Sequence, residues 1–123
     1  VESVDVYPTL AAACGLKLPS HLEGVSLLPI ITGQADSLKP AAYSQVYGLK
    51  NYPNMLAYSL RTHRHRYVEW RDVADGLKLI NTELYDLGVI GAERKNIAQN
   101  PEQAEVIQAC RALMRAGYAT LPQ

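Results

Sequence analysis

The sequence lacks an excess of charge of either sign, because its 12 Lys and Arg residues balance its 12 Asp and Glu residues. The field of the whole molecule therefore attracts neither nucleic acid nor an anionic membrane, and we expect neither partner. No apolar run approaches the roughly 18 residues of a membrane-spanning helix. The first residues also lack the charged and apolar stretches of a secretory signal peptide. The sequence assigns no cellular compartment.

Cysteine is scarce as well. Cys14 and Cys110 stand far apart without CxxC or Cys/His spacing, which argues against a disulfide framework or a cysteine metal site and leaves a single disulfide open. Both fall on apolar stripes of expected helices, so we expect reduced core residues. His63 and His65 would share one face of an extended strand, but a third ligand is missing nearby, and no metal site is expected.

The chain also lacks an initiator methionine, and its first residues already follow an apolar pattern, so we expect a piece of something longer. Helical spacing predicts a short helix over 3–14, and SLLPII over 26–31 predicts a single turn. A polar stretch with Gly and Pro follows over 32–40. We therefore expect a helical segment over 1–36 and a sheet-plus-helix subdomain over 37–123.

The segment Met55–Trp70 predicts a β-hairpin, because apolar and polar residues alternate with period two on both sides of the tip formed by residues 62–64. Strand patterns also occur over 41–48 and, as one bent strand or two short ones, over 77–87. Asn100 and Pro101 begin the clearest helix, which reaches residue 118 with Arg111 and Arg115 expected on its outer face. Its apolar stripe needs a sheet to lie on. The predicted fold is α+β, a small antiparallel sheet of about four strands with this helix packed on it.

One basic cluster stands out, made of Arg61, His63, Arg64, His65 and Arg66. One interpretation is a solvated hairpin end that balances acids elsewhere. Another is that part of it faces an anionic group such as sulfate, phosphate or carboxylate, for which arginine offers bidentate geometry. Binding of nucleic acid would need a wider basic surface.

The pieces VDVYPTLAAACGL, EGVSLLPI, AAYSQVYG, MLAYSLRTHRHRYVEW and ELYDL, followed by an amphipathic helix, occur in this order over nearly the whole chain. This order resembles the C-terminal part of the sulfatase family, within the alkaline-phosphatase-like superfamily, and AYSQ, AYSLRT and RYVEW resemble its iduronate-2-sulfatase-like branch. The resemblance implies a missing N-terminal α/β domain. That domain would carry the formylglycine nucleophile, made from Cys or Ser in Cys/Ser-x-Pro-x-Arg, and a divalent cation, usually calcium.

Neither Cys14 nor Cys110 lies in such a motif, since Gly15 and Arg111 follow them. We therefore expect no catalytic residue and no metal ligand in this chain, and no activity from it alone. The resemblance implies the part of a sulfatase that completes the fold and walls the substrate pocket, with the catalytic sulfatase domain as partner. The residues expected to face substrate are Gln45, Tyr47, Arg61, His63, Arg64 and Trp70.

An alternative is a free-standing α+β binding or oligomerisation module derived from the same scaffold. In either case, an apolar face that once met the catalytic domain could be covered by a homodimer.

Overall fold

The computed structural model describes residues 1–118, leaving aside the side chains of Leu49 and Ala92. The chain forms two compact units, Val1–Ala42 and Tyr43–Gln123. The domain boundary expected between residues 36 and 37 stays a prediction. Within the described part of the chain, no helix has both the length and the apolar character needed to cross a membrane.

The first unit is helical, as the sequence predicts. Its elements are η1 (Ser3–Asp5), α1 (Val6–Ala13) and α2 (Leu28–Ile31). Pro8 is tolerated in the first turn of α1, where backbone N–H groups have no partner within the helix. Helix α1 contains no charged residue. Its apolar side chains therefore point in all directions rather than along one stripe.

A buried carboxylate organises this unit. Asp5 is fully buried and accepts hydrogen bonds from the backbone N–H of Glu2 (2.9 Å), the backbone N–H of Val25 (3.0 Å) and Lys39 Nζ (2.8 Å). Burial alone would raise the pKa of Asp5, but the bonds from Lys39, Val25 and Glu2 outweigh it, so the pKa lies below its ordinary value. One side chain thus joins three segments that are far apart in sequence.

Thr9 and Gly24 complete this connection. The Thr9 hydroxyl accepts a hydrogen bond from the backbone N–H of Leu27 at 2.9 Å. Leu27 directly precedes α2, so this bond joins the start of α2 to α1. Gly24 lies so close to η1 that a Cβ there would stand 1.9 Å from the carbonyl oxygen of Val4. Asp5 and Thr9 of DVYPTL and Gly24 of EGVSLL therefore hold these two segments together.

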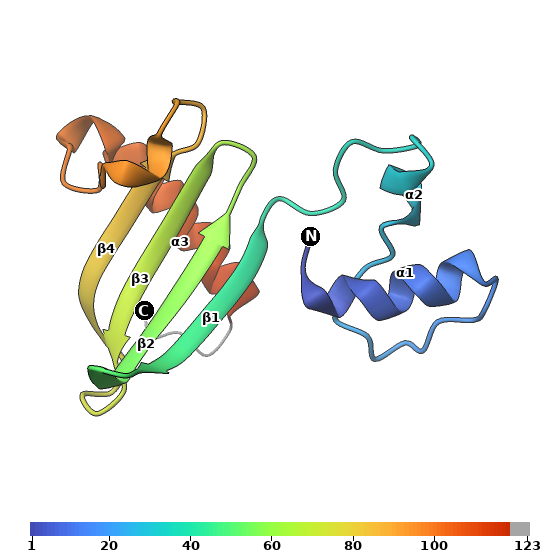
Figure 1. The fold of residues 1–123 in the computed structure, drawn as a ribbon, viewed down its shortest axis with the longest axis horizontal. Coiled ribbons are helices and arrows are strands. Elements are labelled where there is room, and N and C mark those ends of the chain that lie inside the picture. Colours follow the sequence, from blue (N-terminus) through green and yellow to red (C-terminus); the bar gives the residue numbers. More distant parts are fainter. Residues whose placement is uncertain (119–123) are drawn as a thin grey trace. The chain divides into compact units, whose positions relative to one another are not determined.

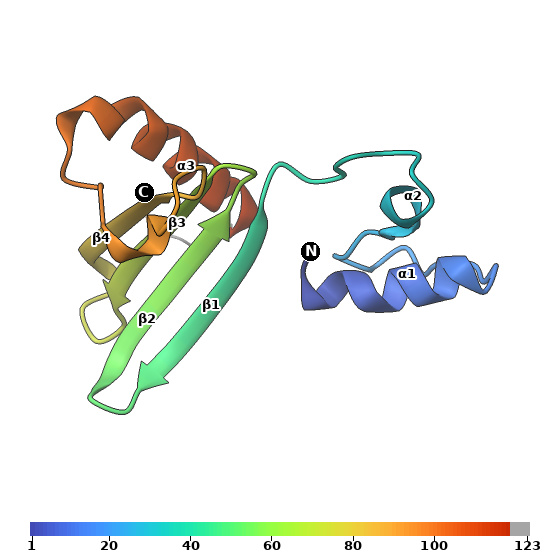
Figure 2. The same cartoon turned by 45° about the horizontal axis from the view of Figure 1, so that its top comes forward.

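The second unit is a four-stranded antiparallel sheet with α3 (Ala104–Gly117) across one face (Figures 1 and 2). The strands follow one another in the order β1-β2-β3-β4. Their bounds are β1 Ala42–Leu49, β2 Tyr52–Arg61, β3 His65–Asp72 and β4 Lys78–Asp86. Two 3-10 turns, η2 (Ala92–Arg94) and η3 (Pro101–Gln103), connect β4 to α3. This confirms the expected α+β fold and hairpin, and the segment over 77–87 is one strand with a register shift opposite Trp70/Arg71.

The core lies between the sheet and α3. Leu60 of β2 pairs with Tyr67 of β3, which pairs with Leu84 of β4, and all three side chains are fully buried. Met114 and Cys110 cover them from α3, with 1% and 3% of their surface exposed. The alternation of the hairpin therefore places Leu60 and Tyr67 on the helix side.

The free edge of β4 is covered by Asn96. Its side-chain oxygen accepts from the backbone N–H of Leu84 at 3.0 Å, and its amide donates to the carbonyl of Thr82 at 3.1 Å. The backbone of Ile97 adds a bond to the carbonyl of Leu84 at 2.9 Å. An unpaired strand edge would otherwise invite pairing with another chain.

Two expectations about side-chain orientation were wrong. Cys14 is exposed at the end of α1 rather than packed in a core, because the helix stops before another turn can cover it. Arg111 is half-buried rather than outward-facing, because its Nε donates to the hydroxyl of Tyr67 at 3.0 Å. Both cysteines are free thiols, and burial raises the pKa of Cys110.

Candidate functional site

The tip between β2 and β3 is closed by a threonine rather than by glycine. The Thr62 hydroxyl accepts from the backbone N–H of His65 at 2.9 Å, and the Thr62 N–H donates to the carbonyl of His65 at 2.9 Å. These bonds hold the loop without a residue of positive φ. His63 and Arg64 therefore project from an ordered turn.

Arg64 is bound on its own protein. Its Nε and Nη2 donate to the two carboxylate oxygens of Asp86 at 3.0 and 2.8 Å, a bidentate pair that joins the tip to the end of β4. The Arg64 guanidinium, helped by the backbone N–H of Gly88, lowers the pKa of Asp86 to about 2. Arg64 therefore stabilises the contact between the hairpin tip and the end of β4.

This pair gives a direct prediction. In Arg64→Gln we expect the pKa of Asp86 to rise from about 2 toward its ordinary value of 3.8, because the main source of its depression is removed. The side-chain carboxyl carbon of Asp86, followed by NMR during acid titration, reports the midpoint. Arg61→Gln is the matched control and should leave the midpoint in place. An unchanged midpoint in Arg64→Gln would show that the pair does not exist in solution.

The rest of the basic cluster is divided between paired and unpaired groups. Arg66 forms an ion pair with Glu93 at 2.8 Å. Arg61, directly opposite Arg66 in the sheet, is exposed, and so is His63. Within residues 1–118 neither the side chain of Arg61 nor that of His63 makes a hydrogen bond or an ion pair. These two side chains are the part of the tip that remains available to an anion.

Trp70 lies on the face of the sheet opposite α3, because it is three residues from Tyr67 along β3. It is half-buried, and its Nε1 donates to Glu83 at 2.9 Å, while the hydroxyl of Tyr85 donates to the other oxygen of Glu83 at 2.9 Å. Arg61 shares this face through its pairing with Arg66. The open face thus combines aromatic rings, a carboxylate and a free guanidinium.

The six expected substrate-facing residues do not form one cluster. Arg61 and Trp70 share the open face but are offset by about 13 Å along the strands, four residues at about 3.3 Å each. Gln45 and Tyr47 are exposed on β1 and share a face with Tyr43, whose hydroxyl donates to the carbonyl of Leu113 in α3. That is the other side of the sheet. A substrate role for the six residues remains a proposal.

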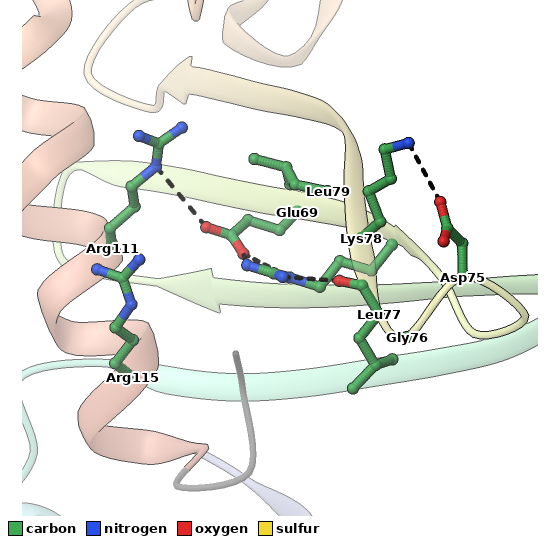
Figure 3. A pocket seen from close by; sticks show the side chains of 9 residues that line it. Glu69, Asp75, Gly76, Leu77, Lys78, Leu79, Arg111 and Arg115 are labelled. Carbon is green, nitrogen blue, oxygen red and sulfur yellow. Dashed lines mark hydrogen bonds and ion pairs between the residues drawn. The ribbon is translucent and has the colours of Figure 1, made fainter. Parts of the chain in front are cut away.

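A buried polar network that the sequence did not predict lies under α3 (Figure 3). Glu69 and Arg71 of β3 are both nearly buried, with Arg71 Nε donating to Glu69 at 2.9 Å and Arg71 Nη1 donating to the carbonyl of Leu77 at 2.8 Å. Tyr67 donates its hydroxyl to the other Glu69 oxygen at 2.8 Å. Burial, followed by the bond to Glu69, raises the pKa of Tyr67 to about 12, so Tyr67 remains a neutral donor.

The cofactors of a sulfatase do not fit the described residues. Within residues 1–118 no group of three His, Cys, Asp or Glu side chains is placed to hold a metal ion. Cys110 is buried under the sheet, and Cys14 is followed by Gly15 and Leu16 instead of the formylglycine motif. No chemical step is therefore assigned to this chain.

The same architecture occurs in solved sulfatase structures. A 2-O GAG sulfatase superposes with a TM-score of 0.75 and 26% identity over 96% of this chain, which is 26% of the larger protein. In sequence, the chain is 27% identical over 113 residues to a Delta 4,5-hexuronate-2-O-sulfatase of Bacteroides thetaiotaomicron and 32% identical over 105 residues to human arylsulfatase K. It spans 22% and 18% of these relatives, so about a fifth of their length.

The four-stranded sheet with its closing helix, found as one part of larger sulfatases, defines the class as a sulfatase C-terminal subdomain. The model of the family "N-sulphoglucosamine sulphohydrolase, C-terminal" matches residues 1–118, and the chain belongs to that family. The resemblance seen in the sequence is thereby confirmed at the level of the sulfatase family.

Proposed function

We propose that this chain is the portion of a sulfatase that completes the fold of the catalytic domain and walls its substrate pocket, without catalysing sulfate ester hydrolysis by itself. The nucleophile and the charge-stabilising cation that this chemistry needs would lie in the preceding part of the parent protein, as formylglycine and calcium. The family match and the share of the relatives covered both support this assignment.

Helix α1 is the observation that carries the proposal. It has no charged residue, and Val6, Tyr7 and Leu10 remain 53–61% exposed, so these side chains do not pack within their own unit. A helix that is apolar all round is normally buried in a larger protein. In the parent protein, the catalytic domain would cover these exposed apolar side chains of α1.

The gene provides a direct test. Reading the DNA upstream of Val1 should reveal an in-frame Cys/Ser-x-Pro-x-Arg motif in the same open reading frame, preceded by enough sequence for an α/β domain. A stop codon followed by a start site just upstream of Val1 would refute the proposal. It would leave the free-standing module as the better account.

The alternative module has one observation in its favour. The second unit closes its own core, with Leu60, Tyr67 and Leu84 at 0% exposure. In that case a second copy of the chain would cover the apolar surface of α1. Sedimentation velocity of the purified chain would then show a dimer that dissociates in Leu10→Glu, whereas a monomer at all concentrations would count against the module.

A further inference from the structure

A hollow of about 330 Å³ lies between α3, the end of β3 and the start of β4 (Figure 3), away from the hairpin tip and its basic cluster. Its walls are mostly charged. Arg111 and Arg115 come from α3, Arg71 and Glu69 from β3, and Asp75 and Lys78 from the turn and start of β4. The parts of the family resemblance found in the sequence do not explain this concentration of charge.

Most of these charges neutralise one another in pairs. Arg71 is bound to Glu69, and Lys78 forms an ion pair with Asp75 at 3.1 Å. Arg111 uses only its Nε, which donates to Tyr67 and lies 3.8 Å from Glu69, so its two terminal nitrogens are unbonded within residues 1–118. The side chain of Arg115 makes no hydrogen bond or ion pair with the described residues. Two guanidinium groups in the hollow therefore have donors that residues 1–118 do not use.

We propose that this hollow is a binding site for an oxyanion, the sulfate or carboxylate group of an acidic ligand. Arg111 and Arg115 are four residues apart on α3, so they lie on the same side of the helix, one turn apart. Each guanidinium presents a planar pair of donors that matches two oxygens of such a group. This inference does not rest on the function proposed above.

The floor of the hollow is held in a fixed, strained shape. Leu77 adopts a φ of +65°, a left-handed conformation that is costly for a side chain of this kind. Its carbonyl accepts from Arg71 and its N–H donates to the carbonyl of Asp72 at 2.7 Å, which together keep the turn in this conformation. Strain that the surroundings maintain is typical of binding sites. The turn that lines the hollow therefore has a backbone conformation held by two hydrogen bonds.

Titration of the full 123-residue chain with sodium sulfate, followed by NMR at constant ionic strength against sodium chloride, tests the site. We expect saturable shifts of the Arg111 and Arg115 Nε–Hε signals and of the Lys78 and Leu79 amides. Arg115→Gln should weaken sulfate binding about tenfold, the loss of one charge-assisted contact. Arg94→Gln, an exposed arginine outside the hollow, is the matched control and should bind sulfate like the parent chain.

A parallel titration with sodium acetate distinguishes the two sources of the oxyanion. A stronger response to sulfate assigns the site to a sulfated ligand, and a stronger response to acetate assigns it to a carboxylate. Linear shifts that do not saturate with either salt, or equal weakening by Arg115→Gln and Arg94→Gln, would overturn the proposal. Arg115 is exposed, so its substitution is not expected to disturb the fold.

Discussion

Replacing Glu69 by alanine is expected to lower the free energy of unfolding by about 3–5 kcal/mol, the range for breaking a buried ion pair from one side. Arg71 would remain under α3 with its guanidinium unpaired, and Tyr67 would lose the acceptor of its hydroxyl. The side chains of Glu69 and Arg71 are only 4% and 7% exposed, so the guanidinium left behind is poorly solvated. The cost therefore comes mainly from the charge left behind.

Urea unfolding followed by the fluorescence of Trp70 measures this loss. Glu93→Ala is the matched control, because it removes a carboxylate that is paired with Arg66 but is 49% exposed, and it should cost no more than about 1 kcal/mol. The double variant Glu69→Ala/Arg71→Met should be less destabilised than Glu69→Ala, since no unpaired charge stays buried. Equal effects of Glu69→Ala and Glu93→Ala would show that the network does not hold α3 on the sheet.

Replacing Asp5 by alanine is expected to destabilise the first unit by about 3 kcal/mol. The part-buried N–H of Val25 would lose its acceptor and Lys39 would lose one of its two charged partners, and both changes are destabilising. Amide hydrogen exchange at Val25 and Leu27 reports this unit separately from the sheet. Asp36→Ala removes an exposed carboxylate of the same unit and should leave both exchange rates near those of the parent chain.

The pKa of Asp5 adds a pH dependence of known sign. Because its folded-state pKa lies below the ordinary 3.8, the unfolded chain binds the proton more tightly. The contribution of Asp5 is thus complete above pH 3.8 and is lost as the pH falls through the folded-state pKa. Faster exchange at Val25 in that acid range is expected in the parent chain and not in Asp5→Asn. An identical acid response in both would contradict the role of this carboxylate.

The parts of the fold that the sequence predicted are those governed by local periodicity. Period two in the hairpin placed Leu60 and Tyr67 on one face, and the helical stripe placed Cys110 and Met114 against them. A single face of each element meets the core, so a pattern along the chain is enough to identify it.

The features that the sequence did not predict depend on pairs distant along the chain. The sequence predicted that Arg111 faces outward, because a charged residue is normally solvated. Its acceptor, the hydroxyl of Tyr67, lies 44 residues away along the chain and could not be identified from the pattern. A signal for the buried pair was present nonetheless. Glu69 lies two residues after Tyr67 in β3, so both side chains are on the buried face of the strand. A charged residue rarely occupies such a position unless it has a buried partner.

The sequence predicted which residues belong to the candidate site, but not how their side chains are arranged in space. The sequence could group Arg61, His63 and Arg64 because they are neighbours, but it could not show that Arg64 is bound to Asp86 of another strand. Nor could it place Trp70 and Tyr47 on opposite faces of the sheet without a knowledge of the helix side. The sequence pattern predicts the strands and helices, whereas the face of the sheet that each strand residue occupies is known only once the side covered by α3 is known.

The proposed role is tested most directly by sulfate release from the parent protein with and without this segment. The complete reading frame, expressed with formylglycine formation, should release sulfate from at least one member of a panel of sulfate esters. We expect the same protein ending just before Val1, and the 123-residue chain alone, to release none above the buffer blank. Undiminished sulfate release by the parent protein without this segment would contradict the account, and so would turnover by the isolated chain.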